Sequence, residues 1–319
     1  MKPIIIDVDT GTDDALAILY AVRHPDLDVR GISCVIGNVS VDQAVINTCK
    51  VLDAASAGDI PVAAGAAQPL IEHARREGGG SHGPDGLAGI QLSEPLRHPS
   101  PMHAVDLLHQ LIMASAEPVS LVSLAPKTNL ALLLTSYPDI ATRLEQIIFM
   151  GGSASETVAE FNVWQDPEAA RLVLESSVPI TMYGLDLFDR LVVNRADVGL
   201  LRTHDHPAIW LAGELLHRRN VRHNDSDHEQ LRLLGDAGAM VLLTNPELFV
   251  IEERNVAVQL QGAGRGQTEL SEASAPRAQL GADKSESRIR FAADLDATKA
   301  ASAFVETIYT YAASGKDYS

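Results

Sequence analysis

Four carboxylates lie within eight residues near the N-terminus, in the segment Asp7-Val8-Asp9-Thr10-Gly11-Thr12-Asp13-Asp14. The segment directly follows the apolar run Ile4-Ile5-Ile6, which predicts a buried strand. Like charges packed this closely repel one another, so the cluster needs a cation or strong hydrogen-bond donors to compensate it. Ligand sets made only of oxygen select hard cations, Ca²⁺ or Mg²⁺, over zinc. The segment therefore predicts a divalent-metal site at the mouth of a sheet.

Short apolar runs alternate with amphipathic stretches from residue 3 to about residue 190. The predicted strands are 4–8, 29–35, 60–64, 119–124, 147–150 and 180–183. Predicted helices begin near residues 13, 41 and 166, and a further helix runs through residues 130–134. Strands that alternate with helices are typical of βαβ units. We therefore expect an α/β fold in one domain, residues 1–319, with a central, mostly parallel sheet flanked by helices. The polar, glycine-rich stretch 262–288 is interpreted as a surface loop or hairpin.

Several residues follow the predicted strands at the point where each strand ends. They are Asp9, Asn38, Leu124, Met150 and Asp186. In an open parallel sheet, ligands bind outside the carboxyl ends of the strands, where such residues converge. The placement predicts one site rather than several.

The composition limits the class of partner. Asp and Glu number 42 against 25 Lys and Arg, a net charge of −17, which opposes binding to nucleic acid or to an anionic membrane. Two cysteines, Cys34 and Cys49, are too few for a disulfide framework, and we interpret them as reduced core residues of a cytoplasmic protein. No apolar run approaches a membrane span, and the N-terminus lacks the layout of a signal peptide.

The segment Asp7–Ala15 resembles the N-terminal signature DxDxGxDDA of the inosine-uridine preferring nucleoside hydrolase family. Further motifs of that family follow in order: His82-Gly83-Pro84-Asp85-Gly86-Leu87, Leu124-Ala125-Pro126-Lys127-Thr128-Asn129, Met150-Gly151-Gly152, Ala159-Glu160-Phe161-Asn162, Asp166-Pro167-Glu168-Ala169-Ala170 and Arg265-Gly266-Gln267-Thr268. The resemblance implies an α/β, Rossmann-like fold that assembles as a homodimer or homotetramer. It also implies cleavage of the N-glycosidic bond of ribonucleosides with one tightly bound Ca²⁺.

The resemblance implies a metal site and a catalytic base. Asp9, Asp14, Asp236 and the backbone carbonyl of Leu124 are expected to bind the Ca²⁺. Asp9 is expected to take the proton from a metal-bound water as the water attacks the anomeric carbon. The transition state would resemble an oxocarbenium ion, as in other glycoside hydrolyses.

The resemblance also implies a set of substrate-binding residues. Asp13 and Asn162 are expected at the ribose hydroxyls, Glu160 at the 5′-hydroxyl, Asn38 at the water or ribose, and Met150 beneath the sugar. Phe161, His223 and Asp236 are the other residues expected to bind the substrate. Each has a structural alternative. Asn38 can cap the helix that begins near residue 41, and Glu160 and Asn162 can make local hydrogen bonds. Met150 can be core filler, and Phe161 can anchor the domain.

One position departs from the family pattern. The family has a histidine directly before the C-terminal metal aspartate, where it is thought to protonate a leaving purine, and this chain has Gly235 before Asp236. Glycine cannot donate a proton, so another group must assist the leaving base. His82, on the glycine-rich loop 72–86 that we expect to act as a lid, is the preferred candidate, ahead of His223 and His228.

Two other functions remain open at this stage. A haloacid-dehalogenase-type phosphohydrolase would use Asp7 and Asp9 as nucleophile and acid, but it leaves Asp13 and Asp14 unexplained. A ribose-binding protein without activity is suggested by Gly235, although the retained Asp9 favours chemistry. We predict a Ca²⁺-dependent ribonucleoside hydrolase that acts on small-molecule nucleosides, with neither nucleic acid nor membrane as a partner.

Overall fold

The structure is a computed structural model, and it describes residues 1–71, 82–155, 159–222, 232–273 and 287–314. His223 and His228, and all of the glycine-rich loop before His82, lie outside the described residues. The strands of the main sheet are β1 (Lys2–Val8), β2 (Leu27–Cys34), β3 (Val62–Ala64), β4 (Val119–Ser123), β5 (Leu144–Met150), β6 (Ile180–Tyr183), β9 (Phe249–Val258), β10 (Thr268–Glu272) and β11 (Ser287–Leu295). Two short strands, β7 (Val192–Val193) and β8 (Arg232–Leu233), form a separate antiparallel pair.

The main sheet has the strand order β10-β9-β11-β6-β5-β4-β1-β2-β3. Every pair from β3 to β11 is parallel, whereas β9 runs antiparallel to both β11 and β10. The predicted α/β fold with a mostly parallel sheet is therefore confirmed. The antiparallel pairing of β9 with β11 was not predicted. Of the stretch 262–288, interpreted as a surface loop or hairpin, residues 268–272 form β10, which pairs antiparallel with β9, and residues 287–288 begin β11.

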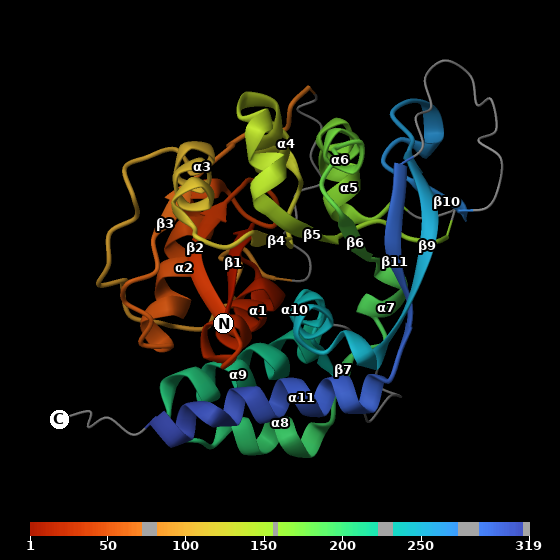
Figure 1. Cartoon of the computed structure of the whole chain (residues 1–319). Helices are drawn as coiled ribbons and strands as arrows, with labels where there is room; N and C mark the ends of the chain where they lie inside the picture. The colour runs from red at the N-terminus through yellow and green to blue at the C-terminus, as the bar shows by residue number, and fades with distance from the viewer. Residues whose placement is uncertain (72–81, 156–158, 223–231, 274–286, 315–319) are drawn as a thin grey trace.

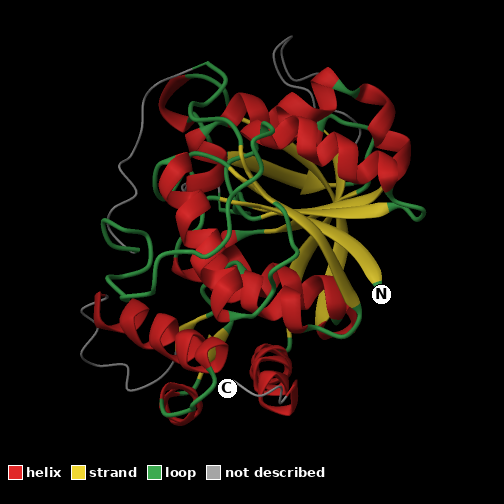
Figure 2. Ribbon diagram, turned by 90° about the vertical axis from the view of Figure 1, so that its left-hand side faces the viewer, coloured by secondary structure: helices red, strands yellow, loops and turns green. Residues whose placement is uncertain are grey.

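Helices cover both faces of the sheet. They are α1 (Thr12–Arg23), α2 (Val41–Ala54), α3 (Ala104–Ala114), α4 (Thr128–Ser136), α5 (Phe161–Gln165), α6 (Pro167–Leu174), α7 (Leu185–Phe188), α8 (Arg195–Arg202), α9 (Pro207–Arg222), α10 (Ala237–Thr244) and α11 (Ala297–Tyr309). In Figure 1, α3, α4, α5 and α6 lie above the sheet, and α1, α9, α10 and α11 lie below it. Figure 2 shows the strands as one layer between the two sets of helices.

The central strand β1 explains why two helical layers are needed. Ile4 and Ile6 pack into one core with Leu16 of α1, whereas Ile5 points to the opposite core with Leu130 of α4. All of these side chains are fully buried. Successive strand residues face opposite sides of a sheet, so a strand that is apolar on both faces must be covered on both.

The topology brings the ends of neighbouring strands together. Asp9 follows β1, Asn38 follows β2, Leu124 follows β4 and Met150 ends β5, and these four strands are consecutive neighbours in the parallel part of the sheet. Their carboxyl ends therefore share one edge of the sheet, as the sequence predicted. Within the described ranges, every helix is too short or too polar to traverse a lipid bilayer.

Candidate active site

Three carboxylates from opposite ends of the sequence meet at this edge. Asp13 and Asp14 lie in the first turn of α1, and Asp236 precedes the first residue of α10. Each offers one oxygen, and the three oxygens lie within 4.8 Å of one another. All three residues are buried. Two helix N-termini therefore point at one cluster of acids, and helix N-termini favour negative charge.

Asp14 has an oxygen available to a ligand. Its Oδ2 accepts the backbone N–H of Gly11 over 2.8 Å, whereas Oδ1 is buried and has no hydrogen-bond partner among the described residues. Burial, followed by the charge of Asp13, raises the pKa of Asp14 to about 7. A buried, unsatisfied carboxylate oxygen is costly unless a cation or donor meets it. The donor set, which consists of oxygen alone, thus fits a hard divalent cation.

Asp9 is held by the turn after β2. The Asn38 backbone N–H donates to Asp9 Oδ2 over 2.6 Å, and Asn38 Nδ2 donates to Oδ1 over 3.2 Å. Asn38 therefore does not cap the following helix, since the capping side chain is Ser40. Burial, and next the charge of Asp14, raise the pKa of Asp9 well above its ordinary value.

Asp13 and Asp9 differ from their expected places in one respect. The group of three close carboxylates found among the described residues includes Asp13, which was expected at the ribose, and not Asp9, which was expected at the metal. Asp9 nevertheless lies beside this group, because Asn38 Nδ2 donates both to Asp9 Oδ1 over 3.2 Å and to Asp14 Oδ2 over 3.4 Å. Both roles remain predictions.

Asn162 joins two of the predicted site residues. Its Nδ2 donates to the carbonyl oxygen of Leu124 over 2.7 Å and lies 3.0 Å from the sulfur of Met150. A carbonyl oxygen has two lone pairs, so Leu124 keeps one for a further ligand. Leu124 itself is fixed by its N–H, which donates to the carbonyl of Asp7 over 2.9 Å.

Glu160 makes the local hydrogen bonds that were the alternative to a substrate contact. Its carboxylate accepts the N–H groups of Asn162 over 3.0 Å and Val163 over 3.1 Å, and so caps α5. The same carboxylate accepts the N–H of Gly152 over 3.1 Å. Phe161, the first residue of α5, is half-buried. The substrate roles of Glu160 and Phe161 stay predictions.

His82 lies against the start of α1. The Thr12 backbone N–H donates to His82 Nδ1 over 3.1 Å, and Thr12 Oγ1 and Asp13 Oδ1 lie 2.9 Å and 3.5 Å from the same nitrogen. Because Nδ1 accepts the Thr12 N–H, the proton of a neutral imidazole ring is assigned to Nε2 here. An acid role for His82 therefore requires a second proton and the loss of the Thr12 hydrogen bond.

The comparison with known proteins identifies the family. The sequence model described as "Inosine-uridine preferring nucleoside hydrolase" matches residues 4–302. The chain belongs to this family. The pyrimidine-specific ribonucleoside hydrolase RihA of Photobacterium profundum is 37% identical over 270 residues, which cover 82% of this chain and 86% of that protein. RihA of Salmonella typhimurium is 37% identical over 271 residues, covering 82% and 85%.

Solved structures agree with this assignment. A plant nucleoside hydrolase, PpNRh1, is 27% identical and superimposes with a TM-score of 0.83 over 96% of this chain and 98% of that chain. An inosine-guanosine nucleoside hydrolase is 25% identical, with a TM-score of 0.87 over 97% and 99%. The chain is thus a nucleoside hydrolase, an N-glycosyl hydrolase that acts on ribonucleosides.

Among the four acids of the N-terminal segment, Asp7 is the one to which the resemblance gives no site role. Asp7 is fully buried, and its Oδ1 accepts hydrogen bonds from Ser33 Oγ over 2.6 Å and Asn129 Nδ2 over 2.8 Å. Burial raises the pKa of Asp7 to about 6. Asp7 therefore ties β1 to β2 and α4, as a hydrogen-bonded core acid. The sequence does not identify the hydrogen-bond partners of Asp7, because these depend on the register of β1 and β2, which pairs Asp7 with Ser33.

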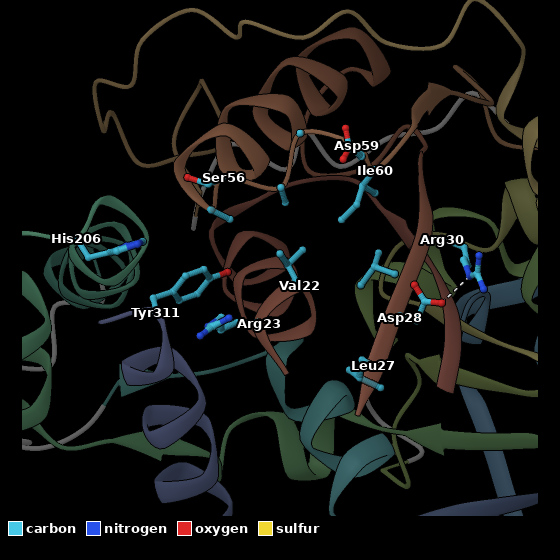
Figure 3. A pocket seen from close by; sticks show the side chains of 14 residues that line it. Val22, Arg23, Leu27, Asp28, Arg30, Ser56, Asp59, Ile60, His206 and Tyr311 are labelled. Atoms are coloured by element: carbon cyan, nitrogen blue, oxygen red, sulfur yellow. Dashed lines mark ion pairs between the residues drawn. The ribbon is translucent and has the colours of Figure 1, made fainter. Parts of the chain in front are cut away.

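A separate cavity of about 810 Å³ lies at the other end of the hydrolase. Figure 3 shows it between the end of α1, the start of β2 and the segment after α2. Arg30 pairs with Asp28 over 2.7 Å, and Arg23 lies 5.6 Å from the centroid of the Tyr311 ring. None of the predicted site residues lines this cavity. It opens at the amino end of β2, whereas the acids gather at the carboxyl ends.

Proposed function

We propose that this hydrolase cleaves ribonucleosides with a Ca²⁺ ion held by Asp14, Asp236 and Asp9 and by the carbonyl of Leu124. The observation that carries the proposal is the meeting of Asp13, Asp14 and Asp236 within 4.8 Å, together with the unsatisfied Oδ1 of Asp14. When bound, the cation would supply the positive charge that orients the ribose hydroxyls and favours deprotonation of a water.

Asp9 is the proposed general base. Its carboxylate takes the proton from the water that attacks the anomeric carbon. The two hydrogen bonds from Asn38 fix the orientation of that carboxylate, so little rearrangement is needed at the moment of reaction. In the metal-free protein, burial and then the charge of Asp14 raise the pKa of Asp9. A cation bound beside Asp9 would favour its ionised form, which is the form that can take the proton.

The remaining residues are proposed to bind the sugar. Asp13 and Asn162 accept and donate hydrogen bonds at the ribose hydroxyls, and Met150, which Asn162 contacts, packs beneath the ring. Glu160 would receive the 5′-hydroxyl on the oxygen that is not already bonded to two backbone N–H groups. Sugar contacts of this kind hold the anomeric carbon near Asp9.

Pyrimidine ribonucleosides are the proposed preferred substrates. The support is the 37% identity to relatives described as pyrimidine-specific. Gly235, whose φ is 58°, also offers no proton donor to a leaving purine at the position before Asp236. His82 is the proposed acid for any substrate whose base needs protonation.

The test is a comparison of uridine, cytidine, inosine and guanosine with the metal-depleted protein before and after addition of Ca²⁺. We expect ribose release only with Ca²⁺, and at least about tenfold higher kcat/KM for the pyrimidine nucleosides. Equal rates on all four nucleosides would contradict the proposed pyrimidine preference but not the proposed hydrolase activity. Tight nucleoside binding without any release of ribose would favour the ribose-binding alternative.

A further inference from the structure

Lys127 carries its positive charge at a position where both the loss of hydration and the helix dipole disfavour a cation. Lys127 has no exposed surface and occupies the N-cap position of α4 without capping it. A buried ammonium loses its hydration, and a cation at a helix N-terminus opposes the helix dipole. Since the cap position adds no negative charge of its own, the compensating charge has to come from elsewhere in the fold.

The contacts of Lys127 place its ammonium beneath the carboxyl ends of β4 and β5. Its Nζ donates to the carbonyl of Met150 over 2.7 Å and to the carbonyl of Ala125, which follows Leu124. The Nζ also lies 4.5 Å from the centroid of the Phe149 ring. One acceptor belongs to Met150, which is assigned to the site, and the other directly follows Leu124, so the ammonium is part of the layer that supports the site.

The compensating charges are those of the acids around the site. The carboxylates that act most strongly on Lys127 are those of Glu160, Asp7, Asp236 and Asp9, in that order. Burial lowers the pKa of Lys127 to about 8, and these acids oppose that change, so the group is cationic at neutral pH. Two of the four acids, Asp236 and Asp9, are proposed metal ligands.

We propose that Lys127 is an internal counter-charge, a positioning residue that stabilises the metal-free acid cluster and weakens its hold on a divalent cation. The inference rests on the proposed function, because it concerns the same metal site. The ammonium and the cation are attracted by the same carboxylates and repel each other. A neutral side chain at this position therefore leaves the acids less compensated without metal and more attractive to it.

Two variants separate the charge from the hydrogen bonds. Lys127→Met removes both, and Lys127→Gln removes the charge while keeping a donor for the carbonyls. Lys299→Met is the matched control, because it removes the same charge from an exposed site on α11 where Lys299 pairs with Asp296. Calorimetric titration of each full-length, metal-depleted protein with Ca²⁺ gives the affinity directly.

We expect both Lys127 variants to bind Ca²⁺ about tenfold more tightly than the parent, and Lys299→Met to change by less than about twofold. We also expect their metal-free forms to unfold at lower temperature than the parent, with the difference reduced in Ca²⁺. Unchanged or weaker binding in both variants, with normal binding by the parent, would overturn the inference. Weaker binding only in Lys127→Met would overturn it too, because the lysine would then act through its hydrogen bonds rather than its charge.

Failure of the proposed metal is recognisable in the same experiment, because neither the parent nor the variants would then bind Ca²⁺. If a variant does not fold without metal, refolding in Ca²⁺ decides the question. The counter-charge role predicts that Ca²⁺ restores the folded protein, since the cation supplies the missing positive charge. A variant that stays unfolded in Ca²⁺ contradicts the inference.

Discussion

The backbone of Gly37 lies so close to Asp9 that a Cβ atom added to the glycine would lie 1.9 Å from Oδ2 of the carboxylate. The contact is between the turn after β2 and the side chain that follows β1. It leaves room for no side chain at position 37, and it places the next N–H, that of Asn38, 2.6 Å from the same oxygen. The turn is thus shaped around the proposed base.

Gly37→Ala should move the Asp9 carboxylate and slow ribose release by about a hundredfold, because a small displacement of a catalytic group has a large effect on rate. The fold should survive, since the carboxylate can rotate away. Gly58→Ala is the matched control, because a Cβ atom there would meet nothing within 4 Å. Steady-state kinetics and circular dichroism of both variants test this. Full activity of Gly37→Ala would show that the close contact between Gly37 and the Asp9 carboxylate is not needed for catalysis.

Asp9→Asn should lower kcat by about 10²–10⁴-fold, the range typical of losing a general base. The amide keeps the shape of the side chain, so the melting temperature should change little. An exposed aspartate provides the comparison, and Asp59→Asn should leave turnover unaltered. If Asp9→Asn turns over uridine at near-normal rates, another residue takes the proton from water.

Removal of divalent metal should abolish ribose release, and Ca²⁺ should restore it. Asp14→Asn and Asp236→Asn should each raise the Ca²⁺ concentration needed for half-maximal activity by at least about tenfold, because each removes a charged ligand. Titrations of activity against free Ca²⁺ measure the effect. Activity that persists in excess chelator would count against a metal-dependent mechanism.

The metal-free protein should lose stability as the pH rises from about 4 to about 7. Burial raises the pKa of Asp7 to about 6 and that of Asp14 to about 7, from an ordinary value of 3.8. Between these limits the folded protein binds more protons than the unfolded chain, so raising the pH favours unfolding. Urea unfolding at several pH values in chelator measures the slope. Asp7→Asn should flatten it, and a slope of opposite sign would contradict the prediction.

His82→Ala should slow inosine more than an activated aryl riboside, because only the former has a leaving group that needs a proton. The expected ratio of the two effects is at least about tenfold. Thr12→Val is a useful companion, since it removes the hydroxyl 2.9 Å from His82 Nδ1 and leaves the ring in place. Equal losses on both substrates for His82→Ala would assign the residue to binding rather than to protonation.

The parallel half of the sheet was predictable because its strands are continuous apolar runs, as Ile4-Ile5-Ile6 illustrates. The antiparallel half was not, because β9 carries Glu252, Glu253 and Arg254 at its centre and alternates irregularly between buried and exposed positions. A strand of this kind is stabilised by its neighbours β10 and β11 rather than by its own pattern.

The acids of the site were predictable from their spacing, whereas the residues that fit around them were not. Gly37 matters because a Cβ atom at this position would lie 1.9 Å from Oδ2 of Asp9. Asp9 follows a different strand, so the sequence around Gly37 does not reveal this contact. Lys127 lies in a sequence that reads as an ordinary turn before a helix, and only the fold brings Glu160 and Asp7 near it. Such roles depend on contacts across the sheet, which local sequence does not encode.

The meeting of Asp14 and Asp236 in one cluster of acids has a consequence for biosynthesis. The first acid leaves the ribosome early, but the second is translated only after most of the chain, so a nascent polypeptide cannot gather the proposed ion until α10 has emerged from the exit tunnel. Prematurely terminated chains that lack Asp236 would never receive the stabilisation that the ion gives. Binding of the proposed ion would therefore stabilise only chains long enough to have placed α10 beside α1.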